Sequence, residues 1–260
     1  MNRLRHTSLP LSGLLLTLFI AWTVSAQQAA RPAQPQARAA EAAPAPRPPV
    51  FFHEAWKIPS GPDPRRIFAQ EWLMNQNLEL KQYGPGTKGH GVEHQDEPRF
   101  KDFAGSLIVN THGEPNNWAY IWSGFAEGNW AFTLRDRNNF VDLSKVEAKI
   151  KWMSWQSGFQ LLRPVIKTAD GKYYVGDNTD GPTADWHEHE IVLADVHWLA
   201  LNPKIAQELG GGWQTPDLSK VDEIGVTTLA RGVAPGSVSC ARVGYIEVIG
   251  NPVPRAVKSN

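Results

Sequence analysis

A five-residue motif, Asp-Leu-Ser-Lys-Val, occurs twice in this chain, at 142–146 and at 217–221. Each copy opens a segment that alternates apolar and polar residues, Val146–Trp152 and Val221–Thr227, which is the period of a half-buried β-strand. Similarity outside the motif is poor, so a duplicated domain is excluded. The motif therefore predicts two turns of similar chemistry, in which Asp and Ser side chains bind nearby backbone amides before a strand.

Further short strands are predicted along the chain, separated by Gly, Pro, Asn and Asp. They lie at Phe51–Trp56, Leu78–Gln82, Ser106–Asn110, Trp118–Trp122, Trp130–Arg135, Phe159–Lys167, Tyr173–Val175, Trp186–Leu193 and Arg242–Ile249. Short helices are predicted at Pro64–Asn75 and Pro203–Leu209. So many strands with little helix predict an all-β fold, a two-sheet antiparallel jelly-roll sandwich with one or two short helices.

The N-terminal region predicts export. Residues 1–26 have a basic start, an apolar run and a small-residue cleavage site, as in a signal peptide. Residues 27–49, rich in Ala, Pro and Gln, predict a disordered spacer. We expect the sandwich domain at 50–254 and a tail at 255–260, in a periplasmic or secreted protein with no stable membrane insertion after signal removal.

The amino-acid composition limits the classes of molecule that this chain could bind. Lys plus Arg and Asp plus Glu are equal at 26 each, so no overall charge attracts nucleic acid, and we expect none to bind. The chain has 11 tryptophans, which serve as core residues or as flat surfaces for stacking on sugars. The single cysteine, Cys240, leaves no partner for an internal disulfide, and we expect a buried thiol.

Three stretches carry a family resemblance: 142–146 running into a strand, Asp185-Trp186 followed by 191–195, and 217–224 with 245–248. In this order they resemble the galactose-binding-like jelly rolls, which include carbohydrate-binding modules of polysaccharide-degrading enzymes and the complex I intermediate-associated protein group. The resemblance covers residues 118–250. It implies a concave sheet face that binds poly- or oligosaccharide and, as a possible cofactor, a structural calcium ion.

Aromatic and hydrogen-bonding residues between 118 and 163 provide the chemistry that sugars need. Strand alternation predicts that Trp130 and Trp152 are buried. It leaves as ligand-binding candidates Trp122, Arg135, Trp155, Gln156 and Arg163. An arginine in a groove would favour acidic sugars, whereas the alternative for Arg135 is a salt bridge with Glu127 or Asp136.

A pair of histidines, His187 and His189, predicts a possible metal site, because residues two apart on a strand share a face. The alternative is a pair of hydrogen-bonded histidines at the edge of the domain. The candidates for a third ligand are His90, His94, His112, Glu114 and His197. The sequence does not choose among them.

Three functions remain open. The first is a non-catalytic carbohydrate-binding protein. The second is a secreted polysaccharide lyase or glycoside hydrolase, with catalytic candidates His112, Glu114, His187 and Glu188. The third is an adaptor that binds another protein. No pair of carboxylates with glycosidase spacing is evident, so we expect binding rather than catalysis. The sequence specifies neither the glycan nor the oligomeric state.

Overall fold

The structure is a computed structural model that describes residues 47–57, 66–67, 72–84, 108–110, 119–123, 129–158, 160–229 and 240–256. The predicted signal peptide and nearly all of the spacer lie outside these residues. So do several side chains named above: His90, His94, His112, Glu114 and Glu127.

Within the described residues, the first sheet has seven strands in the order β11-β8-β15-β5-β4-β2, and β1 also pairs with β15. Its strands are β1 (Val50–Glu54), β2 (Arg66–Ile67), β4 (Ile108–Asn110), β5 (Tyr120–Trp122), β8 (Lys149–Gln156), β11 (His187–Val192) and β15 (Ala241–Ile249).

The second sheet has nine described strands in the order β13-β12-β10-β9-β14-β6-β3, with β7 paired to both β14 and β16. They are β3 (Leu78–Tyr83), β6 (Trp130–Asp136), β7 (Asn139–Asp142), β9 (Leu162–Thr168), β10 (Tyr173–Gly176), β12 (Trp198–Asn202), β13 (Gln207–Gln214), β14 (Val221–Thr228) and β16 (Asn251–Pro254). Every strand pair is antiparallel.

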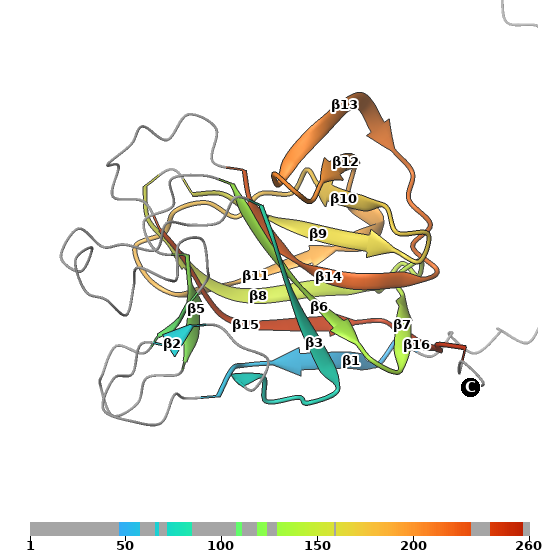
Figure 1. Ribbon diagram of the computed structural model, residues 1–260, viewed down its shortest axis with the longest axis horizontal. Coiled ribbons are helices and arrows are strands. Elements are labelled where there is room, and N and C mark those ends of the chain that lie inside the picture. Colours follow the sequence, from blue (N-terminus) through green and yellow to red (C-terminus); the bar gives the residue numbers. More distant parts are fainter. Residues whose placement is uncertain are drawn as a thin grey trace, which may run out of the picture. The chain divides into compact units, whose positions relative to one another are not determined.

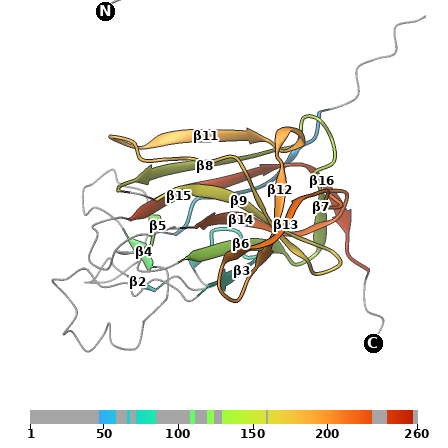
Figure 2. The ribbon, with the colours of Figure 1, turned by 90° about the horizontal axis from the view of Figure 1, so that it is seen from above.

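The two sheets form the layers of a sandwich. Figure 2 shows β11, β8 and β15 as one layer beside β9, β14 and β6 as the other. Apolar side chains from both layers form one buried cluster, which includes Trp152 of β8 and Phe132 of β6. The expected burial of Trp130 and Trp152 is confirmed, because they are 2% and 0% exposed. The predicted jelly-roll sandwich is therefore confirmed.

The two copies of the repeated motif form the same turn, as predicted. The amide and the hydroxyl of Ser144 donate to Asp142 Oδ1 at 2.9 and 2.6 Å, and those of Ser219 donate to Asp217 Oδ1 at the same distances. The turns lie side by side, since the Leu143 amide donates to the Leu218 carbonyl at 2.8 Å. The expected strand start at Val146 is wrong, because that residue is 67% exposed and β8 begins at Lys149.

The predicted helix at 203–209 is wrong, and the described residues of the predicted helix at 64–75 are not α-helical. Arg66–Ile67 forms β2, which pairs with β4, and a turn at 203–206 leads directly into β13. Pairing between strands overrides local helix propensity here. The described residues contain no α-helix; a 3₁₀ turn at Leu193–Asp195 follows β11.

The turn between β12 and β13 contacts the end of β3, although β13 and β3 lie at opposite edges of the second sheet. In Figure 1, β13 (orange) lies beyond β12 and β10, away from β9 and β14. The Gly84 amide after β3 donates to the Pro203 carbonyl at 3.0 Å, and Asn129 Nδ2 donates to the Ala206 carbonyl at 2.8 Å. Gly84 has a φ of +91°, and a Cβ there would lie 2.6 Å from the Asn129 carbonyl oxygen, so the contact requires glycine.

The β12–β13 hairpin encloses part of the outer face of the second sheet. A second buried apolar cluster lies on that face. Its members are Val165, Val175 and Leu201, from β9, β10 and β12, and Leu229, which follows β14. An outer face that is partly apolar and partly covered differs from the polar outer face of an ordinary sandwich. It provides a hollow in which a ligand could be held.

Replacing Trp130 by alanine should lower the free energy of unfolding by about 3 to 5 kcal/mol, because a fully buried ring leaves a cavity between the sheets. Urea unfolding followed by circular dichroism measures this loss. The control is Trp213→Ala: that side chain is 60% exposed, so its loss should change stability by less than about 0.5 kcal/mol. Equal losses in both variants would contradict the assignment of Trp130 to the core.

Candidate functional site

The predicted ligand-binding residues lie in three different regions, so the structure does not bring them together in the single groove expected from the sequence. Trp122 and Trp155 both neighbour Arg242 on the outer face of the first sheet. Arg135 and Arg163 project from the outer face of the second sheet, whereas Gln156 is 0% exposed and lies between the sheets. Register between distant strands separates them, although they are close in sequence.

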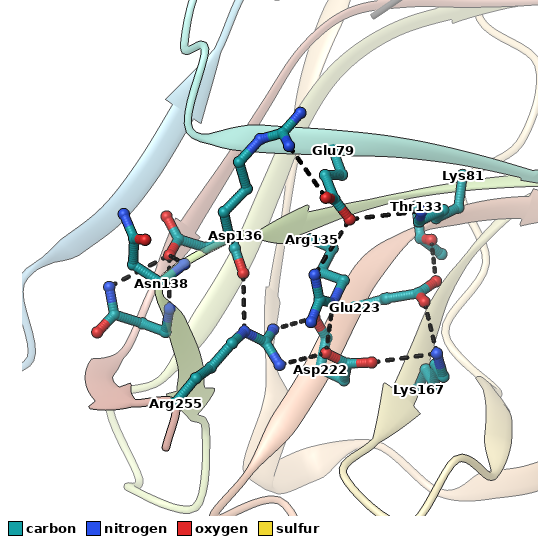
Figure 3. Close-up of polar contacts among 12 residues, drawn as sticks. Glu79, Lys81, Thr133, Arg135, Asp136, Asn138, Lys167, Asp222, Glu223 and Arg255 are labelled. Carbon is teal, nitrogen blue, oxygen red and sulfur yellow. Dashed lines mark hydrogen bonds and ion pairs between the residues drawn. The ribbon is translucent and has the colours of Figure 1, made fainter. Parts of the chain in front are cut away.

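Arg135 belongs to an ion-pair network on the second sheet (Figure 3). Its Nε donates to Asp222 Oδ1 at 2.9 Å and its Nη1 to Glu79 Oε2 at 3.1 Å. Asp222 also pairs with Arg255 at 2.6 Å and with Lys167 at 3.1 Å. The salt-bridge alternative therefore describes Arg135, with partners other than the expected Asp136.

The network sets the charge of Asp222. Burial alone would raise the pKa of this carboxyl group, but the hydrogen bonds and charges of Lys167, Arg135 and Arg255 outweigh it and hold the pKa below its usual value. Asp222 is therefore ionised at neutral pH. It links strands β6, β9 and β14 with the C-terminal segment that carries Arg255.

Glu223 extends this network into the sheet. It is 2% exposed and accepts hydrogen bonds from Thr133 at 2.6 Å, Tyr83 at 2.7 Å and Lys167 at 2.8 Å. Burial, followed by the hydrogen bonds to Tyr173 and Glu223, raises the pKa of Tyr83. A buried carboxylate held by three donors is a structural group, because its oxygens are already occupied.

Arg163 is different, because it lines a pocket of about 650 Å³ on the outer face of the second sheet. Its Nε donates to the Gly176 carbonyl at 2.6 Å and its Nη1 to Glu208 Oε1 at 2.5 Å. The pocket is lined by Gly158, Leu161, Arg163, Asp177, Thr179, Pro182, Leu199, Glu208, Trp213 and Leu229. Apolar side chains and a fixed ion pair thus surround one space.

Trp213 supplies an aromatic surface to this pocket and was not a sequence candidate. It is 60% exposed, and its ring centroid lies 5.5 Å from that of His197. Leu199 pairs with Trp213 and Leu201 with Glu208, so residues 209–212 of β13 lie opposite Ala200 alone. Gly211 and Gly212 have φ of +119° and +79°. This glycine bulge brings Trp213 and Glu208 to the same side as Leu199.

The aromatic group on the first sheet is less open to a ligand. The Arg242 guanidinium lies 4.3 Å from the centre of the Trp155 ring. Trp186 lies 6.1 Å from Trp155 and 5.4 Å from Tyr120. A protein cation covers one face of Trp155, whereas Trp213 keeps most of its surface exposed.

His187 and His189 share the inward face of β11, as predicted, opposite Ser154 and Trp152. The structure brings Asp180 to them: His187 Nε2 lies 2.7 Å from Asp180 Oδ1, and the donor atoms of the group all lie within 4.8 Å of one another. Asp180 was not an expected third ligand. It reaches the histidines through an isolated bridge to Leu162, which local sequence does not reveal.

Four of the five candidates for a third ligand lie outside the described residues: His90, His94, His112 and Glu114. Of those candidates only His197 is described, and its Nδ1 lies 2.9 Å from Asp177 Oδ2. Gln156, a ligand-binding candidate, is buried beside the group, where its Nε2 donates to Ser154 Oγ at 3.5 Å.

Two of the four catalytic candidates are described, His187 and Glu188, and they do not converge. His112 and Glu114 lie outside the described residues. His187 and Glu188 are adjacent on β11 and therefore project to opposite faces. Glu188 accepts a hydrogen bond from the Tyr245 hydroxyl on the outer face. The structure therefore does not bring His187 and Glu188 to the same face of the sheet.

Calcium, which the resemblance implied, does not fit the one group of three ligand side chains found among the described residues. Calcium takes six to eight oxygen ligands, whereas two of the three donors here are imidazole nitrogens. The donor set suits a softer ion.

Comparison with known proteins yields only distant structural matches. No protein-family model matches the sequence, and no curated protein does. A family 11 carbohydrate-binding module of a cellulosomal cellulase of Clostridium thermocellum is 18% identical, with a TM-score of 0.37, covering 70% of this chain and 91% of that one.

Two further structures match at similar scores. The Clostridium thermocellum family 11 module in complex with a beta-1,3-1,4-mixed-linked tetrasaccharide is 17% identical, with a TM-score of 0.37 and coverage of 74% and 98%. An exo-beta-agarase is 8% identical, with a TM-score of 0.38 and coverage of 75% and 26%. Identities and TM-scores this low carry no information about the ligand, so the ligand has to be inferred from the side chains of this chain.

Arg135→Ala should lower the free energy of unfolding at pH 7 by about 1 to 3 kcal/mol, because it removes two ion pairs from a partly buried network. Asp222 is held ionised, so its contribution is full above the usual carboxyl pKa of about 4 and is lost as pH falls through its lower folded pKa. The difference between wild type and variant should therefore shrink on acidification. Urea unfolding from pH 7 to pH 3 measures it.

The matched control is Lys145→Ala, whose exposed pair with Asp142 spans 4.0 Å and should contribute less than about 1 kcal/mol. Full stability of Arg135→Ala at pH 7 would contradict the structural role.

Proposed function

We propose that this protein is a non-catalytic carbohydrate-binding protein whose site is the pocket between Arg163, Glu208 and Trp213. The observation that carries this proposal is the exposed ring of Trp213 in a pocket that also holds the Arg163–Glu208 ion pair. Pyranose rings stack their C–H faces on aromatic rings and bind charged side chains through their hydroxyls. The pocket provides both kinds of contact.

The Arg163–Glu208 ion pair also affects whether the pocket prefers neutral or acidic sugars. Glu208 neutralises Arg163 at 2.5 Å, and both side chains are mostly buried, at 16% and 12% exposure. A uronate would have to compete with Glu208 for the guanidinium, whereas a neutral sugar could accept from Arg163 and donate to Glu208. We therefore expect neutral sugars to bind more tightly than acidic ones, contrary to the preference expected from an unpaired groove arginine.

Binding rather than catalysis is favoured by the state of the carboxylates. Glu208 is paired with Arg163 and Asp177 with His197. The hydrogen bonds and charge of His197, which outweigh the effect of burial, hold the pKa of Asp177 below its usual value. A general acid needs a raised pKa instead. Asp177 is therefore poorly suited to protonate a leaving group.

The binding test uses the mature protein on a panel of neutral and acidic polysaccharides, followed by calorimetry with the best ligand. Trp213→Ala should raise the Kd at least tenfold, about 1.4 kcal/mol, because the stacking surface is lost. Trp213→Phe should retain more of the affinity. The matched control is Leu209→Ala, which changes a 49% exposed residue of the same strand outside the pocket and should leave the Kd unchanged.

Two outcomes of this test would reject the proposal. One is unchanged affinity in Trp213→Ala. The other is release of reducing ends or unsaturated products by the wild-type protein, which would indicate a hydrolase or a lyase.

We also propose that the protein is exported, on the basis of the basic and apolar N-terminal pattern. No helix among the described residues is long and apolar enough to cross a membrane. Mass spectrometry of the protein expressed from Met1 should find a mature chain that begins at Gln27. An intact Met1 terminus on the folded protein would contradict this.

A further inference from the structure

We propose that Asp180, His187 and His189 bind a divalent transition metal ion of the zinc class. The three side chains come from two segments, the stretch after β10 and strand β11, and their donor atoms lie within 4.8 Å of one another. None of the three residues lines the sugar pocket, although Thr179, next to Asp180, does. This proposal does not depend on the proposed function.

The first observation is an unpaired buried nitrogen. His189 Nε2 is enclosed by the protein and has no hydrogen-bond partner. Buried polar atoms in native proteins are almost always paired with protein groups, water or a bound ion, so this nitrogen is available to an ion. The ring lies 5.1 Å from that of Trp152, which restricts its position.

The second observation is the way in which Asp180 is held. This residue is 3% exposed. Trp152 Nε1 and Ser154 Oγ donate to its Oδ2 at 2.7 and 2.5 Å. These donors fix the carboxylate so that Oδ1 faces His187 Nε2, at 2.7 Å. Outer hydrogen bonds that orient a ligand in this way are typical of metal sites.

The third observation concerns His187. Its Nδ1 lies 3.2 Å from Thr183 Oγ1, on the side of the ring away from Asp180. A hydrogen bond at Nδ1 leaves Nε2 for the metal. Thus each of the two residues that already meet, Asp180 and His187, has an outer partner that holds its orientation.

The donor set selects the ion. Two imidazole nitrogens and one carboxylate oxygen are ligands of zinc, nickel and copper, whereas magnesium and calcium require oxygen. Zinc bonds of about 2.0 Å place donor atoms roughly 3.3 Å apart. In the structure Asp180 Oδ1 and His187 Nε2 lie 2.7 Å apart and all three donor atoms lie within 4.8 Å, so the side chains would shift to place three protein ligands around the ion. A fourth position would remain for water.

The test uses the mature protein freed of metal with a chelator and then titrated with zinc chloride by calorimetry. Cobalt(II) chloride is a second probe, because its visible spectrum reports nitrogen and oxygen coordination. We expect one zinc ion per chain and a rise in Tm with zinc but not with calcium chloride.

His189→Gln and His187→Gln should each weaken zinc binding at least tenfold and remove the cobalt spectrum. His189→Gln removes no hydrogen bond made by Nε2, so it should fold normally, which circular dichroism checks. The matched control is His53→Gln, which changes a 45% exposed histidine beside Glu247 on the same sheet and should bind zinc like wild type. Zinc binding that persists in both the His187 and His189 variants, or no binding by wild type, would overturn the proposal.

Discussion

The alternation of side chains along paired strands is the constraint on which this structure depends. Because one face of each sheet is buried against the other, every second residue of β8 must fit the interior: Ile150, Trp152, Ser154 and Gln156. The apolar pair fills the core, and the polar pair at the strand end forms a polar region inside the sandwich. Asp180 and His187 meet there. The same rule that builds the core therefore places a buried carboxylate beside two histidines.

Alternation is local, so the sequence predicts the strands, the burial of Trp130 and Trp152, and the shared face of His187 and His189. Register is not local. Arg163 pairs with Thr227, which pairs with Ala131, four residues before Arg135 on β6. At about 3.3 Å per residue, the two arginines are offset by roughly 13 Å along the sheet. They therefore belong to different environments, a pocket and an ion-pair network, although both interrupt apolar strands.

The residues that sequence reasoning missed were placed by contacts between distant segments. Trp213 follows three glycines in a polar stretch, and only the bulge opposite Ala200 turns it into the pocket. Asp180 lies in a loop and reaches the histidines through its bridge to Leu162. The predicted helix at 203–209 failed for a related reason, since residues 203–206 form the turn of the β12–β13 hairpin and Gln207 and Glu208 pair with Asn202 and Leu201.

The contact between Gly84 and the β12–β13 turn also bears on how molecules could associate through the edges of the second sheet. An open sheet presents unpaired backbone groups at its edges, which are templates for pairing with other chains. Among the described residues, β3 pairs only with β6 and β13 only with β12, so both are edge strands. The contact of Gly84 with the turn before β13 draws one end of β3 toward the end of that hairpin. The same hydrogen bond thus gives a partner to a backbone amide at the end of an edge strand, where another chain could otherwise pair.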